Sequence, residues 1–333
     1  MWSRAGGLRR LQRICSLSSY HMRSSLPRIL HYSRSCTTSS HMEVSREVAN
    51  AVAMGYPVVA LETTLVTHGL PYPDNINIAR EMEEIVRSND VIPATIGVLD
   101  GKIYVGMTND QLEQLADMAH VGKAVKISRR DLAHTISQEK SGGTTVAATM
   151  MCAERAGVKI FVTGGLGGVH RGGETTMDVS ADVVELGRTP VAVVCAGIKS
   201  ILDIGRSLEV LETEGVAVAT LGESPDFPAF FSRSSGYKAP FCVESETAAA
   251  RLIDVSIGLG VGSGVVIAVP IPEELSAEGR EVEEAIQVAL QAAESEGIKG
   301  KEVTPYVLQR VNQLTGGKSR QASKPSPLFL HRS

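Results

Sequence analysis

Short apolar runs recur along the chain from Val44 onward, and most are rich in valine and isoleucine. Runs of four to six such residues are typical of strands that helices bury on both faces of a sheet. The pattern predicts strands at Val58 to Leu61, Thr95 to Leu99, Ile103 to Met107, Val125 to Ser128, Ile160 to Thr163, Val191 to Ala196, Val216 to Leu221 and Val265 to Val269.

Between these runs, apolar residues return at intervals of three and four, the spacing of one helix face. The predicted helices are Ile76 to Ser88, Asp110 to Met118, Thr144 to Ala156, Ile201 to Glu214, Glu246 to Leu259 and Glu281 to Glu296. This alternation predicts an α/β fold, a single domain whose mixed, mainly parallel sheet is covered by helices (α/β/α). Asp100-Gly101 between two apolar runs signals a tight hairpin, so one strand pair is expected to be antiparallel.

Composition narrows the class of protein. Hydrophobic residues make up 43% of the 333 and aromatic residues only 4%, so aliphatic side chains supply the core. No run of 18 uncharged apolar residues is present, and we expect no membrane-spanning helix. Residues 43–333 carry 26 basic and 37 acidic side chains, a net charge of −11, which argues against a nucleic-acid surface. The five cysteines are widely spaced, and we predict buried thiols at Cys152, Cys195 and Cys242.

The first 42 residues differ from the rest, with seven arginines, ten serines and no acidic residue. This composition is typical of an organellar transit peptide and predicts a disordered leader ahead of a domain at 43–317, with the mitochondrion as destination. A disordered tail without an address is the alternative. Arg34-Ser35 followed by His41-Met42 approaches the spacing of a peroxisomal signal, and a chain started at Met42 would be cytoplasmic.

Two charged segments follow predicted strands. Glu62 ends the run from Val58, where desolvation raises the pKa of a carboxyl toward that of a general acid; an acid paired with a nearby arginine is the alternative. Lys126 lies in Lys126-Ile-Ser-Arg-Arg-Asp131, which ends a strand and opens a helix. Such a position suits a phosphate group, although the segment also fits a solvated charge cluster. Ser141-Gly142-Gly143-Thr144-Thr145-Val146 adds backbone amides at a further helix start.

The densest glycine stretch, Gly164 to Gly173, directly follows the strand at 160–163. It matches neither the dinucleotide-binding nor the P-loop pattern, so it is no evidence for NAD or ATP. Asp178 and Asp182 follow it, four residues apart. One of them is suited to a hard divalent cation and the other to substrate hydroxyls; two helix-capping acids are the alternative.

Lys199 lies just beyond the uninterrupted apolar strand at 191–196. A lysine held between apolar walls loses solvation, and its neutral amine becomes a nucleophile that can form a Schiff base. A lysine that only reaches along the surface to solvent is the alternative. Lys199, Glu62, Lys126 and the glycine stretch all follow predicted strands, and ligands of open α/β sheets gather at the carboxyl ends of strands.

Taken together, the motifs resemble those of the pseudouridine-5'-phosphate glycosidase family. They are Ala60-Leu-Glu-Thr-Thr64, His68-Gly-Leu-Pro71, Lys126-Ile-Ser-Arg-Arg-Asp131, Gly165-Leu-Gly-Gly-Val-His-Arg171, Asp178-Val-Ser-Ala-Asp182 and Cys195-Ala-Gly-Ile-Lys-Ser200. Their order and spacing also agree, and the resemblance runs from about Val44 to Lys318.

The resemblance implies an enzyme that reversibly cleaves the carbon–carbon glycosidic bond of pseudouridine 5'-phosphate, giving uracil and ribose 5-phosphate. By the same resemblance, Lys199 is the nucleophile, Glu62 the proton donor and Asp178 the ligand of one divalent metal per subunit, usually Mn²⁺. The implied substrate contacts are Lys126, Val146, Ser180, Ala181 and Asp182, and the implied assembly is a homotrimer.

The end of the chain departs from the family pattern. After Gly317 the family continues with an apolar helical segment that contributes to the site, whereas residues 318–333 are basic and contain Pro325 and Pro327, which exclude a helix there. This tail is predicted to be disordered. Two rival hypotheses stay open: a Schiff-base lyase acting on another sugar phosphate, which would also use Lys199 and an anion pocket, and a catalytically impaired sugar-phosphate binder, which the altered tail permits.

Overall fold

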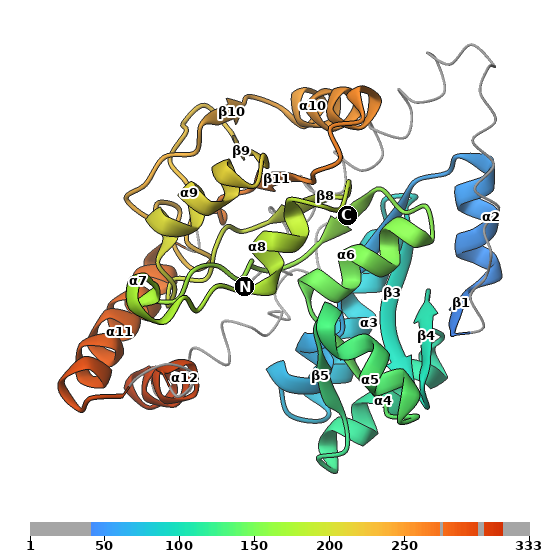
Figure 1. The fold of residues 1–333 in the computed structure, drawn as a ribbon, viewed down its shortest axis with the longest axis horizontal. Helices are drawn as coiled ribbons and strands as arrows, with labels where there is room; N and C mark the ends of the chain where they lie inside the picture. The colour runs from blue at the N-terminus through green and yellow to red at the C-terminus, as the bar shows by residue number, and fades with distance from the viewer. Residues whose placement is uncertain (1–40, 274–275, 299–302, 316–333) are drawn as a thin grey trace, which may run out of the picture.

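The computed structural model describes residues 41–273, 276–298 and 303–315. These residues form three layers, with one sheet between two layers of helices (Figure 1). The predicted leader at 1–42 lies outside the described residues except for His41 and Met42, and the predicted tail at 318–333 lies outside them entirely. Met42 already belongs to the first strand. No described helix combines the length and apolar character that a membrane span requires.

The described strands are β1 (Met42–Val44), β2 (Val58–Leu61), β3 (Ile92–Leu99), β4 (Lys102–Val105), β5 (Val125–Ile127), β6 (Gly142–Thr144), β7 (Ile160–Val162), β8 (Ala192–Cys195), β9 (Ala217–Leu221), β10 (Phe241–Val243) and β11 (Val265–Ala268). Their order across the sheet is β1-β4-β3-β2-β7-β8-β11-β9-β10, while β6 pairs with β3 and β5 with β6. Only the β3–β4 and β3–β6 pairings among these are antiparallel. The prediction of a mixed, mainly parallel sheet is therefore confirmed.

The helical elements are α2 (Arg46–Met54), a π-helical turn η1 (Leu65–Gly69), α3 (Asp74–Arg87), α4 (Asn109–His120), a 3₁₀ turn η2 (Arg129–Asp131), α5 (Leu132–Ser137), α6 (Val146–Arg155), α7 (Gly173–Thr176), α8 (Ala181–Leu186), α9 (Ile204–Thr213), α10 (Glu246–Leu259), α11 (Ser276–Ser295) and α12 (Val303–Leu314). All six predicted helices are present. The sequence pattern missed α2, α12 and the shorter helical elements, of which those with three to six residues hold too little periodicity to detect.

Alternate side chains of the central strands face opposite helix layers. Val58 and Ala60 of β2 belong to a core that includes residues of α2, α6, α8 and α9. Val59 and Leu61 belong to a second core, against α3 and α10. Because both faces are covered, the central strands are apolar throughout and their ends are left to carry polar groups.

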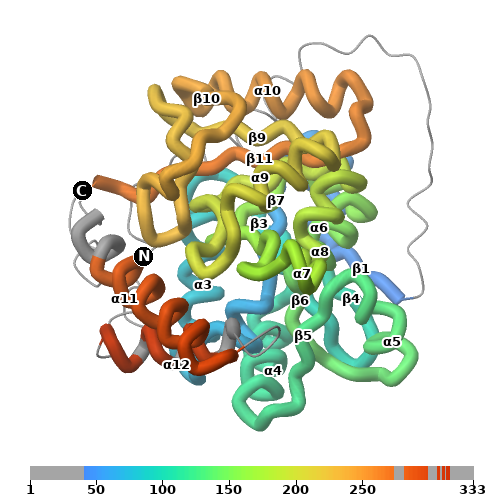
Figure 2. Tube along the Cα trace, turned by 60° about the vertical axis from the view of Figure 1, so that its left-hand side comes forward, coloured from blue at the N-terminus to red at the C-terminus, as the bar shows by residue number. Residues whose placement is uncertain are grey.

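Helices α11 and α12 lie side by side at one end of the molecule, as both Figure 1 and Figure 2 show. They share a small apolar cluster of their own, which includes Val282, Ile286 and Val307. Ile201 and Phe231 pack against this cluster. The pair is thus attached to the rest of the domain through residues near the carboxyl end of β8.

Two local predictions had different outcomes. The turn between β3 and β4 has left-handed backbone at both Asp100 (φ 47°) and Gly101 (φ 73°), so the predicted hairpin is confirmed. Cys152 and Cys195 are buried thiols, as expected, but the prediction was wrong for Cys242, which is exposed. Cys242 lies on β10, which ends the strand order and has β9 as its neighbour.

Candidate active site

The carboxyl ends of β2, β7 and β8 meet at one edge of the sheet, because these three strands are parallel neighbours. Glu62 directly follows β2, Thr163 follows β7, and Lys199 lies four residues beyond β8. The charge of Lys199 acts on the Glu62 carboxyl. The structure therefore brings together the two residues that the sequence singled out for catalysis.

The Glu62 carboxyl is held by a hydroxyl group of the loop that follows β7. Thr163 Oγ1 donates a 2.5 Å hydrogen bond to Glu62 Oε1. Burial raises the pKa of Glu62, and the charge of Lys199 is the largest influence that opposes the rise. Glu62 thus retains its proton to a higher pH than an ordinary glutamate, as a general acid requires. Sequence reasoning missed Thr163, although its position at the end of a buried strand was the signal.

Lys199 is positioned by the glycine stretch beside it. Its backbone N–H donates to the Leu166 carbonyl at 3.2 Å, and the N–H of Ala196 donates to the Gly164 carbonyl at 2.9 Å. The side chain of Lys199 is exposed. The sequence-based expectation of an enclosed lysine was therefore wrong for this structure. Three residues separate Lys199 from the end of β8, enough to carry the side chain beyond the apolar walls of the strand.

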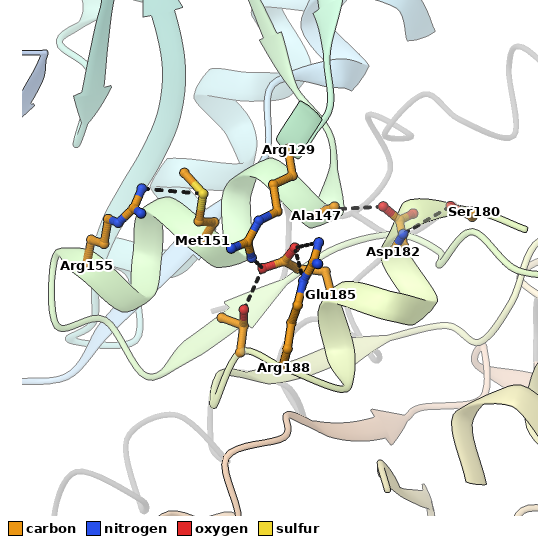
Figure 3. Close-up of polar contacts among 9 residues, drawn as sticks. Arg129, Ala147, Met151, Arg155, Ser180, Asp182, Glu185 and Arg188 are labelled. Atoms are coloured by element: carbon orange, nitrogen blue, oxygen red, sulfur yellow. Dashed lines mark hydrogen bonds and ion pairs between the residues drawn. The ribbon is translucent and has the colours of Figure 1, made fainter. Parts of the chain in front are cut away.

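Asp182 ties two loops of the site together. Its Oδ1 accepts the Ala147 N–H of α6 at 3.1 Å, and its Oδ2 accepts the Gly167 N–H at 3.0 Å. Figure 3 shows the carboxylate reaching toward Ala147, and it shows Ser180 beside the backbone of Asp182. Ser180 caps α8, and Ala181 is the first residue of that helix. This arrangement makes Asp182 a positioning residue, while substrate contact by Ser180, Ala181 and Asp182 stays a prediction.

Lys126 and Val146 lie on adjoining elements. Lys126 is exposed on β5, and Val146 is the first residue of α6. Thr145 joins the two elements, because its N–H donates to the Ile127 carbonyl at 2.9 Å. The Thr145 hydroxyl is buried and has no hydrogen-bond partner among the described residues. An unsatisfied donor at a helix start beside a lysine favours an anionic ligand.

Arg129, which belongs to the same basic segment as Lys126, pairs with a buried glutamate instead of facing the proposed anion site. It donates to Glu185, which is fully buried and also accepts hydrogen bonds from Arg188 at 3.0 Å and from Thr189 at 2.5 Å. In Figure 3 both guanidinium groups converge on the Glu185 carboxylate. Of the basic segment predicted to bind phosphate, Arg129 is therefore structural, because a buried carboxylate requires cationic partners. Lys126 stays exposed.

Asp178 is half-buried, and its Oδ2 lies 3.9 Å from Nδ1 of His170. The described residues contain no group of three or more His, Cys, Asp or Glu side chains that could hold a metal ion. Asp178 therefore offers one oxygen ligand. That fits a hard cation whose other ligands are water and substrate oxygens.

Comparisons with known proteins show what this chain is similar to. The chain matches the family described as indigoidine synthase A like protein over residues 47–325. It is 52% identical over 280 residues to a pseudouridine-5'-phosphate glycosidase of Sorangium cellulosum, covering 84% of this chain and 87% of that one. A pseudouridine-5'-phosphate glycosidase of Deinococcus radiodurans is 50% identical over 285 residues, with coverages of 85% and 90%. The solved structure of the prealnumycin C-glycosynthase AlnA in complex with ribulose 5-phosphate has a TM-score of 0.76 and 36% identity, covering 85% of this chain and 91% of that one.

Proposed function

We infer that this chain, which belongs to the indigoidine synthase A like family and is related to pseudouridine-5'-phosphate glycosidases, is itself such an enzyme. It cleaves, reversibly, the carbon–carbon bond between ribose and uracil in pseudouridine 5'-phosphate, and the products are uracil and ribose 5-phosphate. One observation carries the proposal: Glu62, a buried carboxyl that accepts a hydrogen bond from Thr163, and Lys199, whose charge acts on it, follow parallel strands of the same sheet at their carboxyl ends. About half of the residues are identical to those of the named relatives.

The chemistry requires an electron sink at C1', because a carbon-bound uracil is a poor leaving group. In the proposed reaction the neutral amine of Lys199 bonds to C1', and the ring oxygen leaves with a proton from Glu62. The alkylated amine then returns its extra proton to Glu62, and Glu62 delivers it to the uracil carbon that is bonded to C1'. The carbon–carbon bond breaks with its electrons staying on uracil, while the lone pair of the Lys199 nitrogen forms an iminium with C1'. Water hydrolyses the iminium and releases ribose 5-phosphate. The hydrogen bond from Thr163 fixes the carboxyl for these transfers.

The phosphate is proposed to bind at Lys126 and the start of α6. The exposed Lys126 supplies a charge, and the first turn at Val146 supplies backbone amides. The buried Thr145 hydroxyl gains a partner when an anionic oxygen arrives. The start of α8, at Ser180, Ala181 and Asp182, completes the proposed substrate contacts.

A divalent cation, Mn²⁺ in this proposal, would be held by Asp178 together with water and substrate oxygens. One carboxylate is a sufficient protein ligand for a cation of this kind that keeps most of its waters. When bound, the cation supplies positive charge that orients oxygen atoms of the substrate. Asp178 itself has His170 as its neighbour, at 3.9 Å.

The direct test is incubation of the purified full chain with pseudouridine 5'-phosphate and Mn²⁺, with free uracil followed by chromatography. The matched control is uridine 5'-phosphate, which has the same base on a carbon–nitrogen bond. We expect uracil from the first compound only, and borohydride added during turnover is expected to leave a ribose phosphate adduct on Lys199. Absence of uracil release would contradict the proposal. An adduct without uracil release would favour another sugar-phosphate lyase.

Assembly and location complete the proposal. We propose a homotrimer, to be checked by light scattering of the full chain. We also propose that residues 1–42 direct import into mitochondria, because they combine seven arginines with no acid. A fluorescent fusion of residues 1–42 tests the address. A peroxisomal signal would favour the alternative address, and a diffuse signal would exclude both.

A further inference from the structure

Residues 227–232, here called the strap, lie over the loops that follow β7 and β8. Phe230 N–H donates to the Ala196 carbonyl at 2.9 Å, and the Ser200 hydroxyl donates to the Ala229 carbonyl at 2.7 Å. The approach is close at Gly197, where φ is +100° and an added Cβ would lie 1.9 Å from the Pro228 carbonyl oxygen. The strap is therefore fixed against the same residues, 196–200, that carry Lys199.

Phe230 is the unusual residue of the strap. Its backbone is left-handed, with φ +58°, a conformation that bulky residues rarely adopt and that is found mainly where function requires it. Its ring packs on the glycine stretch, since a Cβ added to Gly164 or Gly165 would lie 3.1 or 2.6 Å from ring carbons. Phe231 supports the ring edge-on, with ring centroids 4.4 Å apart. Phe230 is nevertheless only half-buried, so part of the ring is free to meet a ligand.

Hydrogen bonds connect the Glu62 segment both to the start of α6 and to the loop on which the ring of Phe230 packs. Toward the start of α6, Thr64, two residues after Glu62, donates to the Thr144 carbonyl at 2.7 Å. In the other direction, Thr163 donates to Glu62 itself, and Gly164 comes next in the chain. The proposed phosphate-binding end is thus linked to the Glu62 segment through Thr64, and the loop on which the ring packs is linked to Glu62 through Thr163. When the phosphate of the substrate lies at the start of α6 and its reacting carbon lies at Glu62, the base is directed to the other side of Glu62, where the ring of Phe230 packs on the glycine stretch.

We propose that Phe230 is a specificity-determining residue of this site, and that its ring stacks on the planar pyrimidine base of the substrate. The inference rests on the proposed function. Stacking on a rigid aromatic ring holds a base without covalent attachment. It therefore matters most in the direction of synthesis, where free uracil has no sugar phosphate to hold it.

The experiment measures KM separately for uracil and for ribose 5-phosphate during synthesis by the full chain. Phe230→Leu keeps apolar bulk but removes the flat ring, and we expect it to raise KM for uracil about tenfold or more. We expect its KM for ribose 5-phosphate to stay within about twofold of the original value, because the phosphate contacts other elements. Phe230→Tyr keeps the ring and is expected to restore the KM for uracil. Phe241→Ala removes an exposed phenylalanine on β10 and serves as the matched control.

Two outcomes would overturn the inference. One is an unchanged KM for uracil in Phe230→Leu, and the other is an equal rise in both KM values, which would indicate general distortion of the site. Thermal unfolding of each variant identifies a folding defect, and should Phe230→Leu fail to fold, the comparison of Phe230→Tyr with a Phe230→His variant decides by the same two KM values. Failure of the proposed function is distinguishable, because the unmodified chain would then release no uracil and form no pseudouridine 5'-phosphate.

Discussion

Glu62 and Glu185 are two buried carboxyl groups of the same domain, and their surroundings differ in charge. Each accepts a 2.5 Å hydrogen bond from a threonine hydroxyl. Glu185 has no exposed side-chain surface and two arginine partners, Arg129 and Arg188. Glu62 has one cationic neighbour, Lys199, whose charge lowers the pKa of the carboxyl, while burial raises this pKa by more.

The difference separates a structural acid from a chemical one. The guanidinium groups of Arg129 and Arg188 each bind one oxygen of Glu185, so neither oxygen is available to a substrate. Burial raises the pKa of the Glu62 carboxyl, and Lys199 beside it is exposed to an arriving substrate. Burial of an acid alone is therefore a poor guide to catalysis, and the number of cationic partners is a better one.

The largest effect is expected from Lys199→Ala, which removes the nucleophile from the Glu62 region. We expect kcat to fall by about a thousandfold or more, because the covalent route is lost, while the melting temperature stays close to that of the unmodified chain, since the side chain is exposed. Turnover assays and borohydride trapping with mass spectrometry measure both. Lys238→Ala, at another exposed lysine, is the control. A ribose phosphate adduct found on Lys126 would show that the nucleophile is wrongly assigned.

Glu62→Gln is expected to lower kcat by about a hundredfold or more, the usual contribution of a general acid. Since the pKa of Glu62 is raised in the folded chain, its contribution to stability is present at acidic pH and is lost as pH rises through the folded pKa. The variant should therefore be more stable than the unmodified chain at pH 8 and lose this advantage below about pH 4.3, the ordinary value for glutamate. Calorimetry at both pH values measures the change, and equal stabilities at pH 8 would contradict the burial argument.

Glu185→Ala tests the other half of the comparison. Removing the carboxylate leaves two arginines without their buried partner, and we expect a loss of about 3 kcal/mol in the free energy of unfolding, at the low end for buried pairs because both arginines are partly exposed. Denaturant unfolding measures the loss. The folded fraction should keep the KM of the unmodified chain. A selective rise in KM without loss of stability would instead place Glu185 in the site.

Asp178→Ala is expected to lose most of the activation by Mn²⁺, because it removes the one carboxylate proposed to hold the cation and leaves only waters and substrate oxygens. Titration of activity with Mn²⁺ measures it. His170→Ala, at the neighbour of Asp178, is the matched control. An Asp178→Ala variant with the same Mn²⁺ dependence as the unmodified chain would remove Asp178 from the metal site.

Sequence reasoning was most successful where residues are buried on both faces. The strands at 58–61, 160–163 and 191–196 could be predicted with the side chains at their ends, because long apolar runs leave little ambiguity. The partners of those side chains could not be predicted, because Thr163 and Glu62 are 101 residues apart. The role of Arg129 was missed for the same reason, since it depends on Glu185, 56 residues further along the chain.

The strand order also sets when the site can form during synthesis. β8, which leads to Lys199, lies between β7 and β11, although β11 is made some 70 residues later than β8. Until the ribosome has released residues 265–268, one edge of β8 is unpaired and open to other chains. A nascent chain that already contains Glu62 and Lys199 therefore still lacks the strand that covers this edge of β8, and a chain that ended before β11 would carry both groups on an incomplete sheet.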